Sequence, residues 1–333
     1  MKNKNNLLVN ISYSEAIRKA LLYLFKKDKN FVILGQGVTS PWYVGNTLKD
    51  FDKIYPNRIF DTPVSESLIT GAGVGASLVG LRPFIIHPRM DFMLYAADTI
   101  INQAAKWSYI TGGASCVPVT IRAIINRGGS QGAQHSQSLH SLFAHIPGLR
   151  IVMPSNSKDA HDLLIASVKC NDPVIFIDDR WLYENKQKFK PDYKINLAKV
   201  NPKIIKKGKD ITIVASSYSA HLSLEAGIKL SKINISAEII DLRVINPLKV
   251  DLIIKSVKKT KRLLVVDGSW ENCGLSSQII SSVCQKINLN ILKCNPTSIT
   301  LPNSPAPSSH VLENYYYPNV DLIVKKTKRY FNK

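Results

Sequence analysis

The stretch Phe60–Pro83, FDTPVSESLITGAGVGASLVGLRP, decides how the rest of this chain is interpreted. A lone glutamate, Glu66, follows a Pro-containing turn and leads into the small residues Gly71, Ala72, Gly73, Gly75, Ala76, Ser77 and Gly80. Side chains this small permit close packing against another backbone or a bound cofactor. A charge beside such packing is costly unless it is paired, although a helix dipole also favours a glutamate at the N-terminus. Local sequence therefore leaves two interpretations of Glu66 open: a carboxylate that pairs with a partner or cofactor, or a helix N-terminal residue favoured only by the dipole.

The glycines at 71, 73 and 75 do not form a dinucleotide-binding fingerprint. That motif needs an apolar strand directly before its first glycine, and here TPVSESLIT precedes it. No acidic residue follows at the position that would hold a ribose. We therefore interpret the small residues as one face of a helix that allows a tight interface.

Strands and helices alternate outward from this stretch. Short apolar, β-branched runs typical of buried strands are FVILG, VPVTIRAII, LRIVMP, PVIFIDD, ISAEIIDLRV and RLLVVDG. Helical spacing of apolar residues separates many of them, beginning with AIRKALLYLFKK after the capping box Ser12-x-x-Glu15. This alternation predicts an α/β fold with mainly parallel sheets.

The 333 residues are enough for two domains. The polar segment from about 181 to 202, WLYENKQKFKPDYKINLAKVNP, has two prolines and little periodicity, and a new strand–helix series restarts at DITIVASS. We predict one domain over residues 1–185, a linker over 186–204 and a second domain over 205–333.

Composition excludes several classes of protein. The net charge of +20 comes from separate lysine and arginine clusters without a zinc pattern, a ribonucleoprotein motif or a basic zipper, so we predict a solvated basic surface and no nucleic-acid partner. The chain has no apolar run long enough for a bilayer and no secretory signal pattern, so no membrane association is expected. Five scattered cysteines without metal-ligand spacing favour a reduced, cytoplasmic protein.

Several motifs together resemble one family. They are Thr62-Pro-Val-Ser-Glu66, GAGVGASLVGLRP, DFMLYAADTIINQAAKWSYITGG, and GAQHSQSLHSLFAHIPGLRIVMPS around His135. The chain is similar to the beta subunit of the decarboxylating component of 2-oxo acid dehydrogenase complexes, which uses thiamine diphosphate. The resemblance implies a transketolase-like pyrimidine-binding domain. AEIIDLRVINPL, TKRLLVVDGSW and ENYYYP resemble the transketolase C-terminal domain.

The resemblance implies a role for three residues. Glu66 would donate a hydrogen bond to a ring nitrogen of the cofactor's pyrimidine, Phe92 would pack against that ring, and His135 would lie near the intermediate derived from the substrate. Without the resemblance, Phe92 reads as a core residue at a helix start. His135 lies among amides and hydroxyls in a glycine-containing loop, which favours a site histidine.

Other residues of these motifs are weaker candidates. His140 and His145 also fall in the histidine motif, and a structural role suits His145. The stretch His87-Pro-Arg-Met90 departs from the family's usual Glu-Phe-Met-Thr-Phe-Asn, which puts substrate preference in doubt. Within it, Arg89 is a candidate ligand for a substrate carboxylate or phosphate, with a plain surface arginine as the alternative.

The sequence lacks the Gly-Asp-Gly motif, followed by an asparagine pair, that usually holds magnesium and diphosphate in thiamine enzymes. The resemblance therefore implies an alpha subunit that supplies those ligands in an α2β2 heterotetramer, with no metal ligand on this chain. It also implies a small 2-oxo acid as substrate and a lipoyl-bearing acyltransferase as the possible acyl acceptor. A split transketolase-like or acetoin-cleaving subunit, and a basic scaffold that has lost catalysis, remain alternatives.

Overall fold

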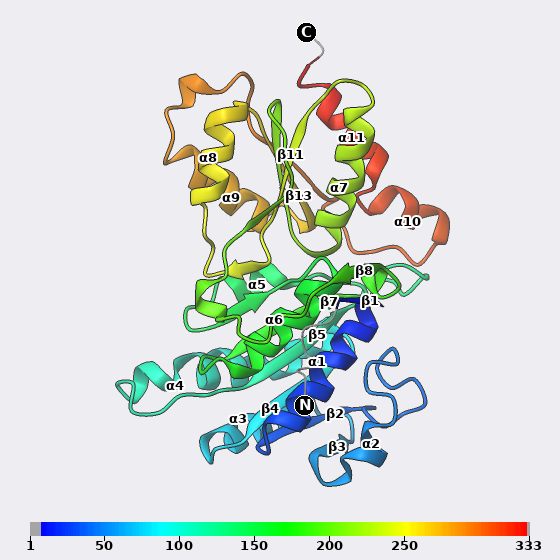
Figure 1. Ribbon diagram of the computed structural model, residues 1–333, viewed down its shortest axis with the longest axis vertical. Helices are drawn as coiled ribbons and strands as arrows, with labels where there is room; N and C mark the ends of the chain where they lie inside the picture. The colour runs from blue at the N-terminus through cyan, green and yellow to red at the C-terminus, as the bar shows by residue number, and fades with distance from the viewer. Residues whose placement is uncertain (1–7, 332–333) are drawn as a thin grey trace.

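The computed structural model describes residues 8–331 and contains two stacked α/β units (Figure 1). The first contains a seven-stranded sheet in the order β12-β6-β7-β5-β4-β2-β3, and the second a five-stranded sheet in the order β14-β13-β10-β11-β9. The strands of the first sheet are β2 (Phe31–Gln36), β3 (Ile59–Thr62), β4 (Arg82–His87), β5 (Thr120–Ile125), β6 (Arg150–Val152), β7 (Val174–Asp179) and β12 (Val244–Asn246). Those of the second are β9 (Lys203–Lys206), β10 (Ile211–Ala215), β11 (Ala237–Asp241), β13 (Leu263–Trp270) and β14 (Thr297–Leu301).

Helices cover the faces of both sheets (Figure 1). The α-helices are α1 (Tyr13–Lys27), α2 (Phe51–Ile54), α3 (Glu66–Leu78), α4 (Ala105–Ile110), α5 (His140–Ala144), α6 (Ser157–Lys169), α7 (Ser217–Ser231), α8 (Asp251–Thr260), α9 (Leu275–Cys284), α10 (His310–Tyr316) and α11 (Val320–Lys328). The predicted capping box is present at α1, where Ser12 Oγ accepts from Glu15 N and Glu15 Oε2 accepts from Ser12 N.

Most strand pairs are parallel, which confirms the predicted α/β fold. Internal strands such as β2, β5 and β7 are buried along nearly their whole length, so they appear in the sequence as continuous apolar runs. Antiparallel pairing is found for β12 with β6 and for β9 with β11, at sheet edges.

Two segments behave differently from their appearance in the sequence. Part of the expected linker forms β8 (Lys186–Phe189), which pairs antiparallel with β1 (Val9–Ser12). Strand β12, from the C-terminal half of the chain, joins the first sheet. Both are short strands that gain their hydrogen bonds from distant partners, so local hydrophobicity does not reveal them.

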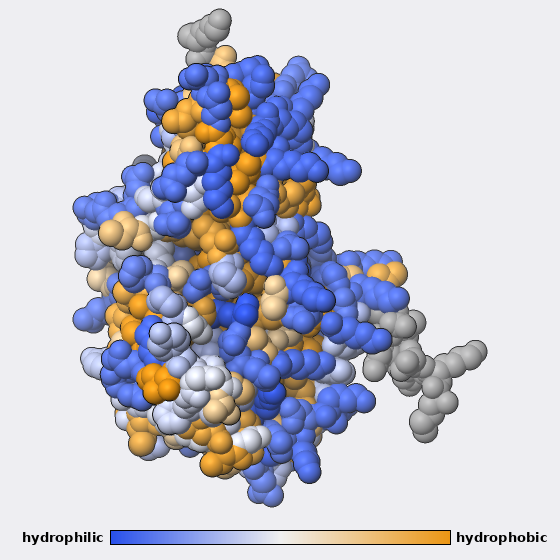
Figure 2. Space-filling view, turned by 90° about the vertical axis from the view of Figure 1, so that its left-hand side faces the viewer, coloured by the Kyte–Doolittle hydropathy of each residue, from blue (hydrophilic) through white to orange (hydrophobic). Residues whose placement is uncertain are grey.

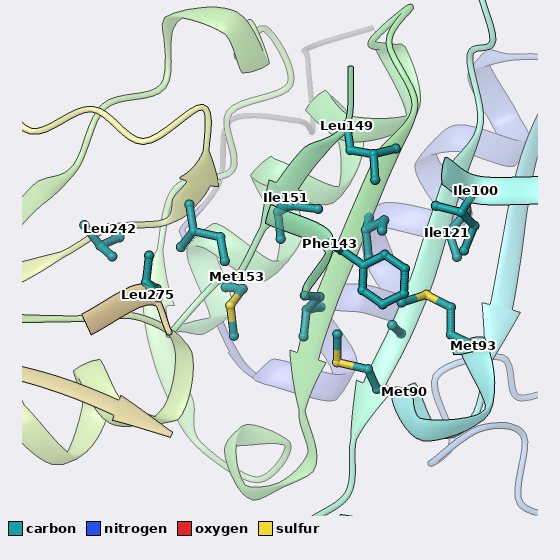
Figure 3. Close-up of a cluster of buried hydrophobic side chains, with 14 of the residues drawn as sticks. Met90, Met93, Ile100, Ile121, Phe143, Leu149, Ile151, Met153, Leu242 and Leu275 are labelled. Carbon is teal, nitrogen blue, oxygen red and sulfur yellow. The ribbon is translucent and has the colours of Figure 1, made fainter. Parts of the chain in front are cut away.

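A single apolar cluster links the two units. Met90, Met93 and Phe143 pack over the first sheet, and the same cluster continues to Leu242 and Leu275 of the second unit (Figure 3). Burial of this shared core favours one fixed arrangement of the two units. Within residues 8–331, no helix is both long enough and apolar enough to cross a membrane.

Candidate active site

Three candidate residues follow strands of the first sheet at its carboxyl edge. Glu66 begins α3 shortly after β3, Phe92 lies in the 3₁₀ helix η3 (Met90–Ala96) after β4, and His135 lies in the loop after β5. Carboxyl ends of parallel strands share one edge of a sheet, and this edge is where α/β proteins bind ligands.

Glu66 is 8% exposed, and its carboxylate makes no hydrogen bond or ion pair with any residue between 8 and 331. Helix α3 packs tightly on β4 because Gly73 has no side chain: a Cβ there would lie 2.4 Å from Ile85 Cδ1. On the opposite face, a Cβ at Gly71 or Gly75 would meet nothing within 4 Å. A largely buried glutamate whose carboxyl group has no partner among the described residues thus stands at the head of a helix whose outer face is open.

His87 links the second turn of α3 to the end of β4. Its Nε2 lies 3.1 Å from Thr70 Oγ1, one turn along α3 from Glu66, and both side chains are buried. Burial lowers the pKa of His87 to about 4, so the imidazole is neutral at neutral pH. The residue that departs from the family motif therefore serves here as a neutral structural link.

Phe92 and His135 face each other edge to face. Their ring centroids lie 5.1 Å apart with planes at 90°, and both side chains are partly buried. This geometry is the favoured one for aromatic pairs. The structure therefore brings two of the three predicted site residues into direct contact.

Asp91 holds the Phe92 and His135 segments together, a role that the sequence analysis missed. Its Oδ1 accepts hydrogen bonds from Gln137 N at 3.1 Å and from Gln137 Nε2 at 2.9 Å, while Oδ2 is buried without a partner among the described residues. Burial raises the pKa of the Asp91 carboxyl. The available signal was an acidic residue directly before Phe92 in an otherwise apolar run.

The other two histidines of the motif lie apart from these groups. His140 is buried between Ser138 Oγ, 2.8 Å from its Nδ1, and Asp267 of the second unit, 3.0 Å from its Nε2. His145 is exposed at the end of α5. Neither histidine interacts with Phe92 in the described contacts. His140 instead forms a contact between the two units.

A cavity of about 440 Å³ opens at the same edge, and its wall includes Gln36, Trp42, Arg89, Arg180 and Tyr183. Arg89 donates to Pro88 O and to Gln131 Oε1, and Arg180 donates to Asn126 Oδ1. Neither arginine forms an ion pair with a described carboxylate. Two guanidinium groups that have only neutral acceptors give the cavity a positive potential suited to an anion.

These residues fit one end of thiamine diphosphate. Glu66 has a carboxyl group without a partner among the described residues, which in its protonated form could donate to a heterocyclic nitrogen, and Phe92 offers an apolar ring surface at the same edge. The fit concerns the aminopyrimidine end of the cofactor.

Two family models match the chain. The transketolase pyrimidine-binding domain matches residues 9–186, and the transketolase C-terminal domain matches residues 201–323. Together they span both units of the fold.

Similar proteins are found across nearly the whole chain. The beta subunit of acetoin:2,6-dichlorophenolindophenol oxidoreductase from Bacillus subtilis is 37% identical over 331 residues, which cover 95% of this chain and 96% of that protein. The mitochondrial pyruvate dehydrogenase E1 component subunit beta from Homo sapiens is 31% identical over 328 residues, which cover 97% of this chain and 91% of that protein.

A solved structure supports the fold. A split gene transketolase, described as an inactive beta4 tetramer, aligns with a TM-score of 0.77 at 21% identity and covers 96% of this chain and 97% of its own. At this level of identity the likeness concerns the fold alone.

Proposed function

Because the chain belongs to the transketolase-like family that includes the beta subunits of pyruvate dehydrogenase E1 and of acetoin oxidoreductase, we propose that it is the beta subunit of a thiamine-diphosphate-dependent 2-oxo acid dehydrogenase component. The observation that carries this proposal is the carboxyl group of the largely buried Glu66, which has no partner among the described residues and lies at the same sheet edge as the Phe92–His135 pair. The two relatives with 37% and 31% identity are both named as enzyme subunits, which favours catalysis over a scaffold role.

When bound, the cofactor would supply a nucleophilic ring carbon for the carbonyl group of the 2-oxo acid and a cationic ring that takes up the electron pair left by loss of carbon dioxide. Glu66 would hold a proton toward a ring nitrogen of the pyrimidine. Phe92 packs against the ring, and His135 exchanges a proton with, or orients, the substrate-derived group. Asp91 keeps the Phe92 and His135 segments in register.

A second chain completes the site. This sequence has no Gly-Asp-Gly motif, so diphosphate and magnesium would be held by an alpha subunit in an α2β2 heterotetramer. The open face of α3 offers a surface for it, bordered by the exposed apolar residues Val64 and Leu68 (68% and 70% exposed). Figure 2 shows apolar patches that interrupt the hydrophilic surface of the first unit. Patches of this kind, beside an incomplete site, are typical of protein interfaces.

The cavity at Arg89 and Arg180 favours a 2-oxo acid over acetoin. A 2-oxo acid carries a carboxylate, which the two guanidinium groups can bind, whereas acetoin is neutral. The 37% identity to an acetoin oxidoreductase subunit nevertheless keeps acetoin cleavage as a second candidate. The turnover of the two substrates should therefore be compared in one experiment.

The acyl acceptor and the compartment complete the proposal. Lipoyl on a carrier acyltransferase would take the acyl group from the enzyme. All five cysteines are free of disulfides. A reducing compartment suits this, and we propose the cytoplasm, although the human relative is named as mitochondrial.

Reconstitution with the alpha subunit tests the function. The chain would be expressed with a candidate partner that carries Gly-Asp-Gly, and thiamine diphosphate binding would be measured by calorimetry for the pair and for each chain alone. We expect tight binding and 2-oxo acid decarboxylation only for the pair. Tight binding and turnover by this chain alone would contradict the proposal that it carries only part of the cofactor site.

The matched substrate test uses Arg89→Gln in the reconstituted pair. We expect KM for the 2-oxo acid to rise about tenfold, the effect of losing one charge-assisted hydrogen bond, while KM for acetoin stays unchanged. An equal effect on both substrates, or turnover of acetoin only, would contradict the proposal that Arg89 binds the carboxylate of the substrate.

A further inference from the structure

We propose that Glu313, in the second unit, is a positioning residue that holds the His135 loop in its working conformation. The inference rests on the proposed role of His135, but the contact that carries it is independent of that role. Glu313 lies 183 positions from the backbone group that it binds, so it acts across the two units.

The His135 loop begins in an unfavourable backbone conformation. Gly128, Gly129 and Ser130 all have positive φ, at 78°, 67° and 60°. Glycine adopts this region freely, but Ser130 pays a steric penalty there, so the turn needs an external contact to persist. Glu313 provides one: Ser130 N donates to both carboxylate oxygens, at 3.1 Å to Oε1 and 3.2 Å to Oε2.

Glu313 is well placed to act as a fixed anchor. It lies on α10 with 5% of its surface exposed, and the one basic side chain within 4 Å of its carboxylate among the described residues is that of the exposed His310, at 3.7 Å. A buried carboxylate without a close ion pair gains from a backbone N–H donor more than an exposed one does. The contact to Ser130 is therefore the main hydrogen bond available to this charge.

The rest of the same segment closes over the loop. Ser308 lies so close to Gly132 that a Cβ there would meet Ser308 Oγ at 2.7 Å. Tyr317 packs its ring against Arg127, at 5.9 Å, and against Trp181, at 5.3 Å. Residues 308–317 thus contact the loop on both sides of Ser130.

The far end of the loop is also held by the second unit. Ser269 Oγ donates to Ser138 O at 2.8 Å, and Gln137 is bound by Asp91. His135 lies between the Ser130 anchor and these contacts at the far end, and it meets Phe92 edge to face. Release of the Ser130 anchor would let the loop sample conformations in which that ring contact is lost, and small displacements of a catalytic group reduce the rate steeply.

Amide hydrogen exchange on the full chain tests the anchor without its partner. We expect Glu313→Ala to speed exchange of the Ser130 amide by about tenfold, and Glu313→Gln, which keeps one acceptor oxygen, to change it less. The matched control is Asp210→Ala, because Asp210 Oδ2 also accepts from a backbone N–H, that of Ser236, and both residues directly precede strands β10 and β11, at the end of the second sheet opposite the edge that faces the loop. Exchange in Glu313→Ala equal to that of the wild type would overturn the anchor.

A second readout separates positioning from mere stability. The ring-current shift of His135 against Phe92, measured by NMR of the labelled imidazole, should shrink in Glu313→Ala and recover in Glu313→Gln. In the reconstituted enzyme, kcat should fall about tenfold in Glu313→Ala, with KM and cofactor affinity unchanged. Faster exchange with an unchanged ring-current shift and unchanged kcat would overturn the positioning role. An inactive wild-type pair would count against the proposed function alone, since the exchange and NMR results would still decide the anchor.

Discussion

The carboxyl edges of the two sheets are used in different ways. In the first sheet, β3, β4 and β5 lead to groups with unmet bonding capacity: Glu66 has no partner, and Asp91 Oδ2 is buried without one among the described residues. In the second sheet, the polar groups near the ends of β11 and β13 lie against the first unit; among them, Asp267 makes no hydrogen bond to a described residue but faces His140 at 3.0 Å. Both edges belong to parallel α/β sheets, so the fold alone does not assign function to either.

The second edge is occupied by the first unit itself. Asp241 accepts from Ser155 Oγ, Asp267 lies 3.0 Å from His140, and Ser269 donates to Ser138 O. Burial, followed by the nearby Asp159, raises the pKa of Asp241 to about 7. An edge that would ordinarily receive a ligand is here closed by docking, which leaves the first edge as the place for chemistry.

The largest effect that this contrast predicts is that of Glu66→Gln in the reconstituted enzyme. The amide keeps the shape of the side chain but has no proton to share in the same way, so we expect kcat to fall by roughly 10³-fold, within the range of acid–base contributions. Subunit assembly, measured by analytical ultracentrifugation, should not change.

Asp241→Asn is the matched control at the second edge. Asp241 is buried, and near pH 7 it is substantially protonated, so an amide closely mimics it and kcat should change less than about twofold. Wild-type activity in Glu66→Gln, or an equal loss in Asp241→Asn, would break the distinction between the two edges.

The sequence predicted the first edge better than the second. Buried parallel strands appear as continuous apolar runs, so FVILG and VPVTIRAII marked β2 and β5 directly. Glu66, Phe92 and His135 were grouped before the structure was known only through the resemblance to the family, and in the structure all three follow strands at one edge of the first sheet. Their roles in catalysis stay predictions.

Contacts between distant segments could not be predicted in this way. Strand β8, KQKF, has no apolar run because it lies at the surface and pairs only with β1. The anchor from Glu313 to Ser130 joins residues 183 positions apart, and no local pattern marks either one. The first unit closes the second edge through contacts of this kind. They cannot be predicted from the sequence one element at a time.

The next test uses pH, because the two edges should respond with opposite signs. Burial lowers the pKa of His87 from 6.5 to about 4, so between these values the unfolded chain binds a proton that the folded chain does not. Stability therefore falls as the pH drops through this window, by at most about 3 kcal/mol. Asp241, with its raised pKa, binds its proton more tightly when folded, so its contribution is lost as the pH rises toward 7.

His87→Gln isolates the first of these effects. Glutamine can still bond to Thr70 but does not titrate, so the free energy of unfolding in urea should lose the His87 slope between pH 7 and pH 4. His221→Gln is the control, because His221 is partly exposed and carries no such burial. A pH profile of His87→Gln identical to that of the wild type would mean that His87 is not the neutral link between α3 and β4.

The smallest of the three effects separates a site histidine from a structural one. We expect His135→Ala to lower kcat by about a hundredfold, as the loss of one proton-transfer group does, and to leave cofactor affinity unchanged. His145→Ala, which removes an exposed histidine from the same sequence motif, should change kcat by less than about twofold. Single-turnover kinetics and calorimetry of the reconstituted pair measure both quantities. If His135→Ala weakened only assembly, the first edge would contain one catalytic carboxyl group and a packing histidine, and its contrast with the second edge would rest on Glu66 alone.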